Sequence, residues 1–305
     1  SVKLSARVLP VSVSVDKDVT WSSSDEKIAT VDDSGKVTGV AAGTALIKAM
    51  TKNGKVSASC EVTVREAGDA ATLYGYVTAS TGDTSLKGNW VSFSADDPSS
   101  LTKVAAGAEV ACAANADGVV YAYLKGGRQL VKINFKGEHY KYENVGAAGA
   151  NVIRTLAYDK KKNKLYGATA LKLFEIDMTT GKQTALNSSM YFGLGSGNML
   201  NSIAADQNGN VYGLMGLGAL CTLDPTTGTG AFVIDKNAAV DGKPSTVANN
   251  SMCFVKNDIL FWASSTSSSI GQNVLKTIDA KTGKLIERRG AIGDGKVKIV
   301  GIFAE

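Results

Sequence analysis

Seven residues of this sequence have side chains suited to holding a sugar. Carbohydrate sites favour aromatic rings, which stack on the apolar face of a sugar, beside amides and charged groups that hydrogen-bond its hydroxyls. The candidates lie in two long polar loops at 187–201 and 235–250 and at the start of the run RTLAYD: Tyr191, Phe192, Asn198, Asn201, Arg154, Asn249 and Asn250. The competing interpretation is that both aromatic residues pack inside the protein and the asparagines shape turns.

Pairs of carboxylates are the second candidate for chemistry. A glycosidase needs two acids facing one pocket, roughly 5–10 Å apart. Asp159 and Asp206 occupy equivalent places in two similar segments, with Asp117 close by, and a residue that recurs in this way is better explained as a turn cap. Glu109 and Glu305 remain as the acids of an alternative hydrolase or lyase.

Other catalytic chemistry has little support in the sequence. His139 is the single histidine and lies in a predicted outer turn, which argues against a histidine-dependent triad and a histidine-rich metal centre. Cys60, Cys112, Cys221 and Cys253 show no metal-binding spacing and lie in apolar strand patterns, where free cysteine acts as a small hydrophobic residue. We therefore expect no catalytic residue, no metal and no cofactor.

The composition indicates an all-β protein. The 305 residues are 44% hydrophobic and 20% charged, with 33 glycines but only four prolines. Short runs of valine, isoleucine, tyrosine and threonine alternate with tight-turn sequences such as DG, NG and TG. The net charge of +5 is mild, and the basic run at 160–164 lies in a predicted turn without interleaved aromatics, so we expect no nucleic-acid partner. No run of 18 apolar residues exists that would span a membrane.

Residues 1–66 are predicted to form a small β-sandwich. Runs such as KIATVD and ALIKAM alternate between apolar and polar residues, which places one face of each strand in a core. The stretch VTWSSSDEKIATVDDSGKVTGVAAGTALIKA at 19–49, followed by SCEVTV, resembles the bacterial immunoglobulin-like domain, group 2. Since that family usually has a further strand upstream, the first strand is expected to be missing or shortened here. The start SVKLSARVLP already alternates like a strand, so we expect that the N-terminus has been cut.

The chain beyond residue 72 repeats itself. An aromatic residue in a short strand recurs after a polar turn, at spacings of 47, 45, 46 and 49 residues. These markers are Tyr74, Tyr121, Tyr166, Tyr212 and Phe261. Each is preceded by an apolar run and followed by another strand, and a turn such as DMTTG or DAKTG comes next. Four strands in about 45 residues are the unit of a β-propeller blade.

The last residues, IVGIFAE at 299–305, begin such a unit without finishing it. We predict that this strand lies beside the Tyr74 strand and completes the first blade, giving a five-bladed propeller over 72–305 closed by residues 299–305. The D-x-x-T-G and A-x-D-x-x-G-N-x-Y segments resemble NHL, YVTN and WD-type repeats. That resemblance implies a fold and says little of function, because propellers host lyases, glycosidases, lectins and scaffolds.

The family resemblance of residues 1–66 implies a bacterial surface protein, where such domains serve as spacers or as adhesive parts. We therefore expect an extracytoplasmic, monomeric protein that recognises a polysaccharide or a surface protein without catalysis, as in cell adhesion. A carbohydrate-active enzyme and a structural scaffold without a small ligand are the alternatives.

Overall fold

The chain divides into two compact units. The computed structural model describes residues 2–9, 18–41, 43–64, 71–134, 141–186, 190–196, 198–216, 218–233, 240, 250–255, 259–265 and 273–304. One unit comprises Ser1–Asp69 and the other Ala70–Glu305. Each is described by itself.

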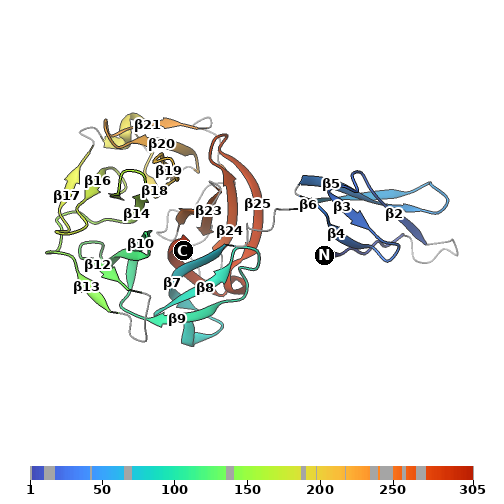
Figure 1. Ribbon diagram of the computed structural model, residues 1–305, viewed down its shortest axis with the longest axis horizontal. Helices are drawn as coiled ribbons and strands as arrows, with labels where there is room; N and C mark the ends of the chain where they lie inside the picture. The colour runs from blue at the N-terminus through green and yellow to red at the C-terminus, as the bar shows by residue number, and fades with distance from the viewer. Residues whose placement is uncertain are drawn as a thin grey trace. The chain divides into compact units, whose positions relative to one another are not determined.

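The N-terminal unit contains two three-stranded antiparallel sheets (Figure 1). One has the order β1-β4-β3, with β1 Val2–Lys3, β4 Lys36–Gly39 and β3 Ala29–Val31. The other has the order β2-β5-β6, with β2 Val19–Ser23, β5 Gly43–Thr51 and β6 Ser57–Val64. The alternation predicted from the sequence is seen in β5, where buried and exposed residues alternate from Thr44 to Thr51.

The core of this unit is small. Ala29, Val37, Ala45 and Ile47 are buried together, and Trp21 packs against them. Asp32 shapes the turn at 32–36, because its Oδ1 accepts hydrogen bonds from the backbone of Ser34 and of Lys36.

The C-terminal unit contains five four-stranded antiparallel sheets, which Figure 1 shows around a common centre. Four of them take their strands in chain order. The first is β10 Val110–Ala116, β11 Val119–Leu124, β12 Leu130–Ile133 and β13 Tyr142–Asn144; the second is β14 Thr155–Asp159, β15 Lys164–Ala168, β16 Leu173–Ile176 and β17 Gln183–Ala185. The third is β18 Leu200–Ala205, β19 Val211–Met215, β20 Leu220–Asp224 and β21 Thr229–Phe232; the fourth is β22 Ser251–Phe254, β23 Leu260–Ser265, β24 Asn273–Asp279 and β25 Lys284–Ala291.

The fifth sheet joins the two ends of this unit. Its order is β26-β7-β8-β9, with β26 Val297–Ala304, β7 Thr72–Ser80, β8 Asn89–Ser94 and β9 Thr102–Ala106. β26 pairs antiparallel with β7, and Phe303 stacks on Tyr74 with 5.3 Å between ring centroids. Three short 3₁₀ helices are described: η1 Thr84–Leu86, η2 Met190–Gly193 and η4 Ile292–Gly295.

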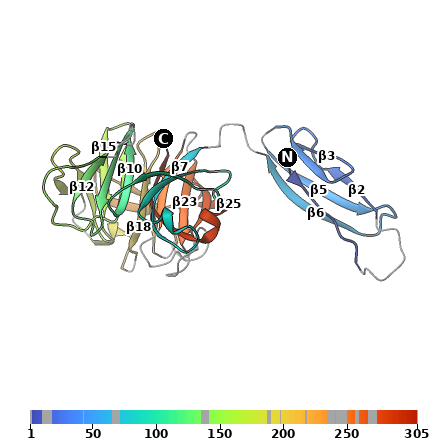
Figure 2. The same cartoon turned by 90° about the horizontal axis from the view of Figure 1, so that it is seen from below.

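The innermost strand of each sheet contacts the innermost strands of its two neighbours. These contacts run from β10 to β14, β18, β22 and β26 and return to β10. The view at right angles shows the strands of this unit from the side (Figure 2). Because all five innermost strands start on one face and end on the other, residues at equivalent positions in them meet around the centre.

The core of this unit lies between the sheets. Five buried clusters each combine residues of two neighbouring sheets, as where Tyr123 of β11 meets Phe174 of β16 and where Leu73 of β7 meets Phe261 of β23. The aromatic markers predicted from the repeat all lie in the second strand of a sheet: β7, β11, β15, β19 and β23.

The predicted aspartate turns join the third and fourth strands. Asp177 Oδ1 accepts from the backbone of Thr179 and of Thr180, at 2.9 and 2.7 Å. Asp224 and Asp279 act in the same way in their own sheets. Backbone donors hold a carboxylate in its charged form, and those of Thr180 and Thr179 lower the pKa of Asp177.

Candidate functional site

The starts of the five innermost strands surround a small cavity of about 40 Å³. The residues that line it include one for each sheet, here called the rim residues: Ala111, Arg154, Asn201, Asn250 and Val300. We call these five residues the strand-start mouth. Arg154, Asn201 and Asn250 come from three consecutive sheets and form a polar arc, whereas Ala111 and Val300 form an apolar arc.

Bulges shape this mouth. The pairing register shifts between Val110 and Cys112 in β10, between Leu200 and Ser202 in β18, and between Val300 and Phe303 in β26. The extra residue of a bulge leaves the ladder and its side chain is re-aimed, a device common at barrel rims. In β18 the extra residue is Asn201, which is how this amide reaches the central cavity.

A row of three hydroxyl groups, here called the hydroxyl row, lies one residue further along β14, β18 and β22. Thr155 Oγ1 accepts a hydrogen bond from the backbone N–H of Ile203 in the next sheet, at 2.9 Å. Ser202 Oγ accepts likewise from Met252 N at 3.0 Å, and Ser251 Oγ from Ile302 N at 2.9 Å. These buried bonds connect four consecutive innermost strands, and they hold the rim residues above them in register.

The polar arc offers hydrogen-bond donors. Arg154 is exposed, and its guanidinium makes no ion pair within the part of the chain that the structure describes. Asn201 Nδ2 is buried and has no acceptor among the residues that the structure describes. Asn250 Oδ1 accepts from the indole Nε1 of Trp262 at 3.2 Å, which fixes one end of that amide. A guanidinium and carboxamides in this arrangement can bind a carboxylate and hydroxyl groups.

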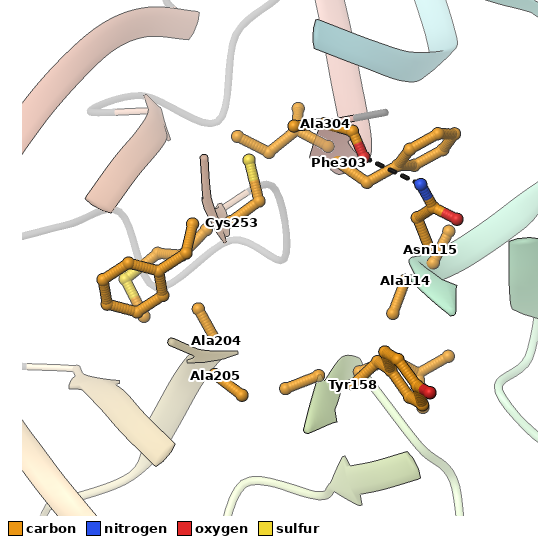
Figure 3. Close-up of a pocket in the computed structure, with 14 residues that line it drawn as sticks. Ala114, Asn115, Tyr158, Ala204, Ala205, Cys253, Phe303 and Ala304 are labelled. Atoms are coloured by element: carbon orange, nitrogen blue, oxygen red, sulfur yellow. Dashed lines mark hydrogen bonds between the residues drawn. The ribbon is translucent and has the colours of Figure 1, made fainter. Parts of the chain in front are cut away.

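The ends of the same strands surround a second cavity, of about 90 Å³ (Figure 3). We call it the strand-end mouth, and it includes Asn115, Tyr158 and Ala304. Its polar groups already have partners in the protein. Asn115 Nδ2 donates to Ala304 O at 2.9 Å, the bond drawn in Figure 3, and the Tyr158 hydroxyl donates to Asp117 Oδ2 at 3.2 Å or Asn163 Oδ1 at 2.9 Å. Burial, and then the charge of Asp117, raises the pKa of Tyr158.

The structure brings together three of the seven residues predicted for a sugar site, namely Arg154, Asn201 and Asn250. Phe192 is fully buried in the cluster between the second and third sheets, so its ring is part of the core there. Asn198 is 7% exposed and its Nδ2 donates to the carbonyls of Leu194 and Gly195, which is the turn-shaping role.

The other two predicted site residues are placed differently. Tyr191 is half-buried, with a positive φ of 60°, in the short helix η2. Asn249 lies outside the described residues. Trp90 and Trp262 are both core residues, at 0% and 1% exposed.

The carboxylates considered for catalysis do not meet at one cavity among the described residues. Asp206 Oδ1 accepts from the backbone of Asn208 and of Asn210, and Asp159 Oδ1 accepts from Lys162 N, so the predicted turn caps are confirmed. Glu109 pairs with Lys125 at 2.9 Å.

Two predictions about ionisable residues cannot be compared with the structure. Glu305 and His139 lie outside the described residues. Within the described ranges there is no group of three or more histidine, cysteine, aspartate or glutamate side chains that could hold a metal.

The hydroxyl row was missed by sequence reasoning, although its signal was present. Thr155, Ser202 and Ser251 stand at the same position of the repeat, in RTLAYD, NSIAAD and NSMCFV. A small hydroxyl recurring at the start of an apolar run indicates a shared backbone contact, since a polar group is otherwise costly to bury.

No helix in the described part of the chain is long and apolar enough to cross a membrane.

Comparison with known proteins shows what the N-terminal unit resembles. Residues 1–62 match the bacterial Ig-like domain (group 2). A lacto-N-biosidase of Bifidobacterium bifidum is 53% identical over 66 residues, which are 22% of this chain and 6% of that protein. An alpha-L-arabinofuranosidase of Bifidobacterium longum subsp. longum is 56% identical over 64 residues, 21% of this chain and 6% of that protein. The chain therefore spans a small fraction of these relatives' length, through the Ig-like region.

Solved structures similar to this chain include a component of the nidogen/laminin complex, with a TM-score of 0.49 and 12% identity over 76% of this chain and 98% of that one. A Bacteroides thetaiotaomicron protein of unknown function has a TM-score of 0.48 and 14% identity, covering 89% of this chain and 78% of that one. The WD40 repeats of RRP9 have a TM-score of 0.38 and 6% identity, covering 59% and 50%. The resemblance of the N-terminal residues to the group 2 Ig-like domain, expected from the sequence, is thus confirmed.

Proposed function

We propose that residues 72–305 form a five-bladed β-propeller closed by the C-terminal strand, and that residues 1–66 form an Ig-like domain. Three observations support this: the five four-stranded sheets, the cycle of contacts among β10, β14, β18, β22 and β26, and the pairing of β26 with β7. A closed ring has no free inner sheet edge and can therefore present a preformed, rigid mouth.

We further propose that the protein is an extracytoplasmic bacterial surface protein, and that the propeller recognises a glycan or a protein without catalysis. The observation that carries this proposal is the polar arc of the strand-start mouth, where a guanidinium and two carboxamides from three sheets converge without a pair of carboxylates among the described residues. Such groups bind and orient a ligand but supply no acid and base. The match to the group 2 Ig-like domain, and the similarity of this region to parts of two glycosidases, are consistent with a carbohydrate-rich setting.

A binding screen with product analysis tests this proposal. The full chain is exposed to bacterial, plant and host polysaccharides and to matrix proteins, and each mixture is then analysed for cleavage. Binding without products, weakened by Asn201→Ala, is the expected result. Cleavage products would refute recognition without catalysis and would support the alternative of a carbohydrate-active enzyme. Glu109→Gln would then be the first variant to assay.

The scaffold alternative makes a different prediction in the same screen. It expects no binding to any member of the panel, and no change in behaviour when the rim residues are replaced. Adhesion through the Ig-like unit alone would give binding that Asn201→Ala leaves intact.

A further inference from the structure

The charge around the strand-start mouth is one-sided. Arg154 is the one charged residue that lines this cavity in the described part of the chain. Glu109, which precedes β10 at the same end of the sheets, already pairs with Lys125 at 2.9 Å. No carboxylate of the described residues neutralises the Arg154 guanidinium, so this mouth offers a positive charge to a ligand.

A second unfilled donor lies on the neighbouring sheet. Asn201 Nδ2 is shielded from bulk water and finds no hydrogen-bond acceptor in the described part of the chain, which is unfavourable for a buried amide. The bulge in β18 nevertheless holds this residue at the cavity. An acceptor brought by a ligand would complete its hydrogen bonds, and an amide beside a guanidinium is suited to an anionic oxygen.

We propose that the strand-start mouth binds the carboxylate of an acidic sugar, such as a hexuronic acid, with Arg154 as the counter-charge and Asn201 as a second donor. This inference rests on the recognition function proposed above and specifies its ligand class.

The size of the cavity suits one carboxylate. A volume of about 40 Å³ exceeds what one water needs but is far below the several hundred ångström cubed of a pocket that encloses a whole ligand. The sugar ring then lies across the mouth. The apolar arc of Ala111 and Val300 meets its carbon skeleton, and the carboxamide of Asn250 meets its hydroxyls.

A sugar fits this arc better than an acidic peptide. Carboxamides both donate and accept, as hydroxyl groups do, and two of them flank a single positive charge. A peptide rich in acidic residues is better matched by several cationic groups, and only one lines this cavity among the described residues.

The test titrates the full chain with D-glucuronic acid and with D-glucose, its neutral counterpart, and follows the indole N–H signal of Trp262 by NMR. That N–H donates to Asn250 Oδ1 at the mouth and therefore reports its occupancy. Glucuronate is expected to shift the signal and to bind at least tenfold tighter than glucose. Arg154→Gln should lower the affinity for glucuronate about ten- to a hundredfold, the range for a charge-assisted hydrogen bond.

Lys172→Gln is the matched control. Lys172 is exposed on the β15–β16 turn of the sheet that carries Arg154, and it does not line the cavity. This variant should change the affinity less than threefold.

Each other outcome overturns the inference in a distinguishable way. Equal binding of glucose and glucuronate, weakened by Asn201→Ala, would leave the recognition function and refute the acidic ligand. Preference for a polyglutamate peptide would keep a carboxylate as the bound group and would refute a sugar as the ligand class. No shift with either sugar, together with no binding in the polysaccharide and protein screen, would remove both proposals.

Discussion

The hydroxyl row should stabilise the association of neighbouring sheets, and Thr155→Val tests this with little change of shape. Valine keeps the branched side chain and its β propensity but cannot accept a hydrogen bond. The N–H of Ile203, a residue that is 0% exposed, then loses its acceptor at 2.9 Å.

The expected cost follows from that burial. A buried donor left without a partner costs about 1–3 kcal/mol of the free energy of unfolding. In a unit of this size each kcal/mol corresponds to about 2–4 °C, so the Tm of the C-terminal unit should fall by about 2–12 °C.

Calorimetry of the full chain measures this shift, and amide hydrogen exchange at Ile203 gives a local readout. Thr222→Val is the control, because the Thr222 hydroxyl donates to Ala231 O at 3.3 Å in an exposed bond. Its free energy of unfolding should change by no more than about 0.5 kcal/mol. If Thr155→Val lowered the free energy of unfolding no more than this control does, and the Ile203 amide stayed equally protected from exchange, the stabilising role of the Thr155–Ile203 hydrogen bond would be refuted.

Three further predictions concern the rest of the chain. Gly301→Ala should destabilise the C-terminal unit by about 2 kcal/mol or more, measured by urea unfolding, because φ is +61° and a Cβ would lie 2.8 Å from Ala113 N; an unchanged midpoint would contradict the close packing there. The pKa of Asp177 is lowered in the folded protein, so its charge stabilises the fold fully above the unfolded pKa near 4, and this stabilisation is lost as the pH falls through the lower folded pKa. Asp177→Asn should therefore make the free energy of unfolding depend less steeply on pH below about pH 4. A pH profile parallel to that of the unaltered protein would contradict the role of Asp177 in the turn. Among the free cysteines Cys60 is exposed and the other three are buried, and burial raises the pKa of each buried thiol to about 12. One thiol per native chain should therefore react rapidly with a disulfide reagent, and Cys60→Ser should abolish that rapid reaction.

Much of the architecture was predictable because repeats express one packing solution several times. Each aromatic marker recurs at the place where a second strand meets the neighbouring sheet, and each aspartate turn needs the same carboxylate and glycine. The two-residue period of β5 likewise reflects one buried face. These are local rules, and a single sequence contains them.

The candidate site was predictable only in part. The chemistry of Arg154, Asn201 and Asn250 was visible in the sequence, but their convergence depends on the ring and, for Asn201, on a bulge that has no clear local signal. Loop length suggested Phe192 as well, yet its ring packs between two sheets. Length and composition indicate where a loop lies and leave open which of its side chains turn inward.

The most direct test of the account is amide hydrogen exchange of the full chain with the polysaccharide that binds best in the screen. We expect new protection at the starts of the innermost strands, at Thr155, Asn201 and Ser251, and none in the N-terminal unit. Protection confined to the outer strands β13, β17 and β21, or to residues 1–66, would place recognition elsewhere and contradict the strand-start mouth as the binding site.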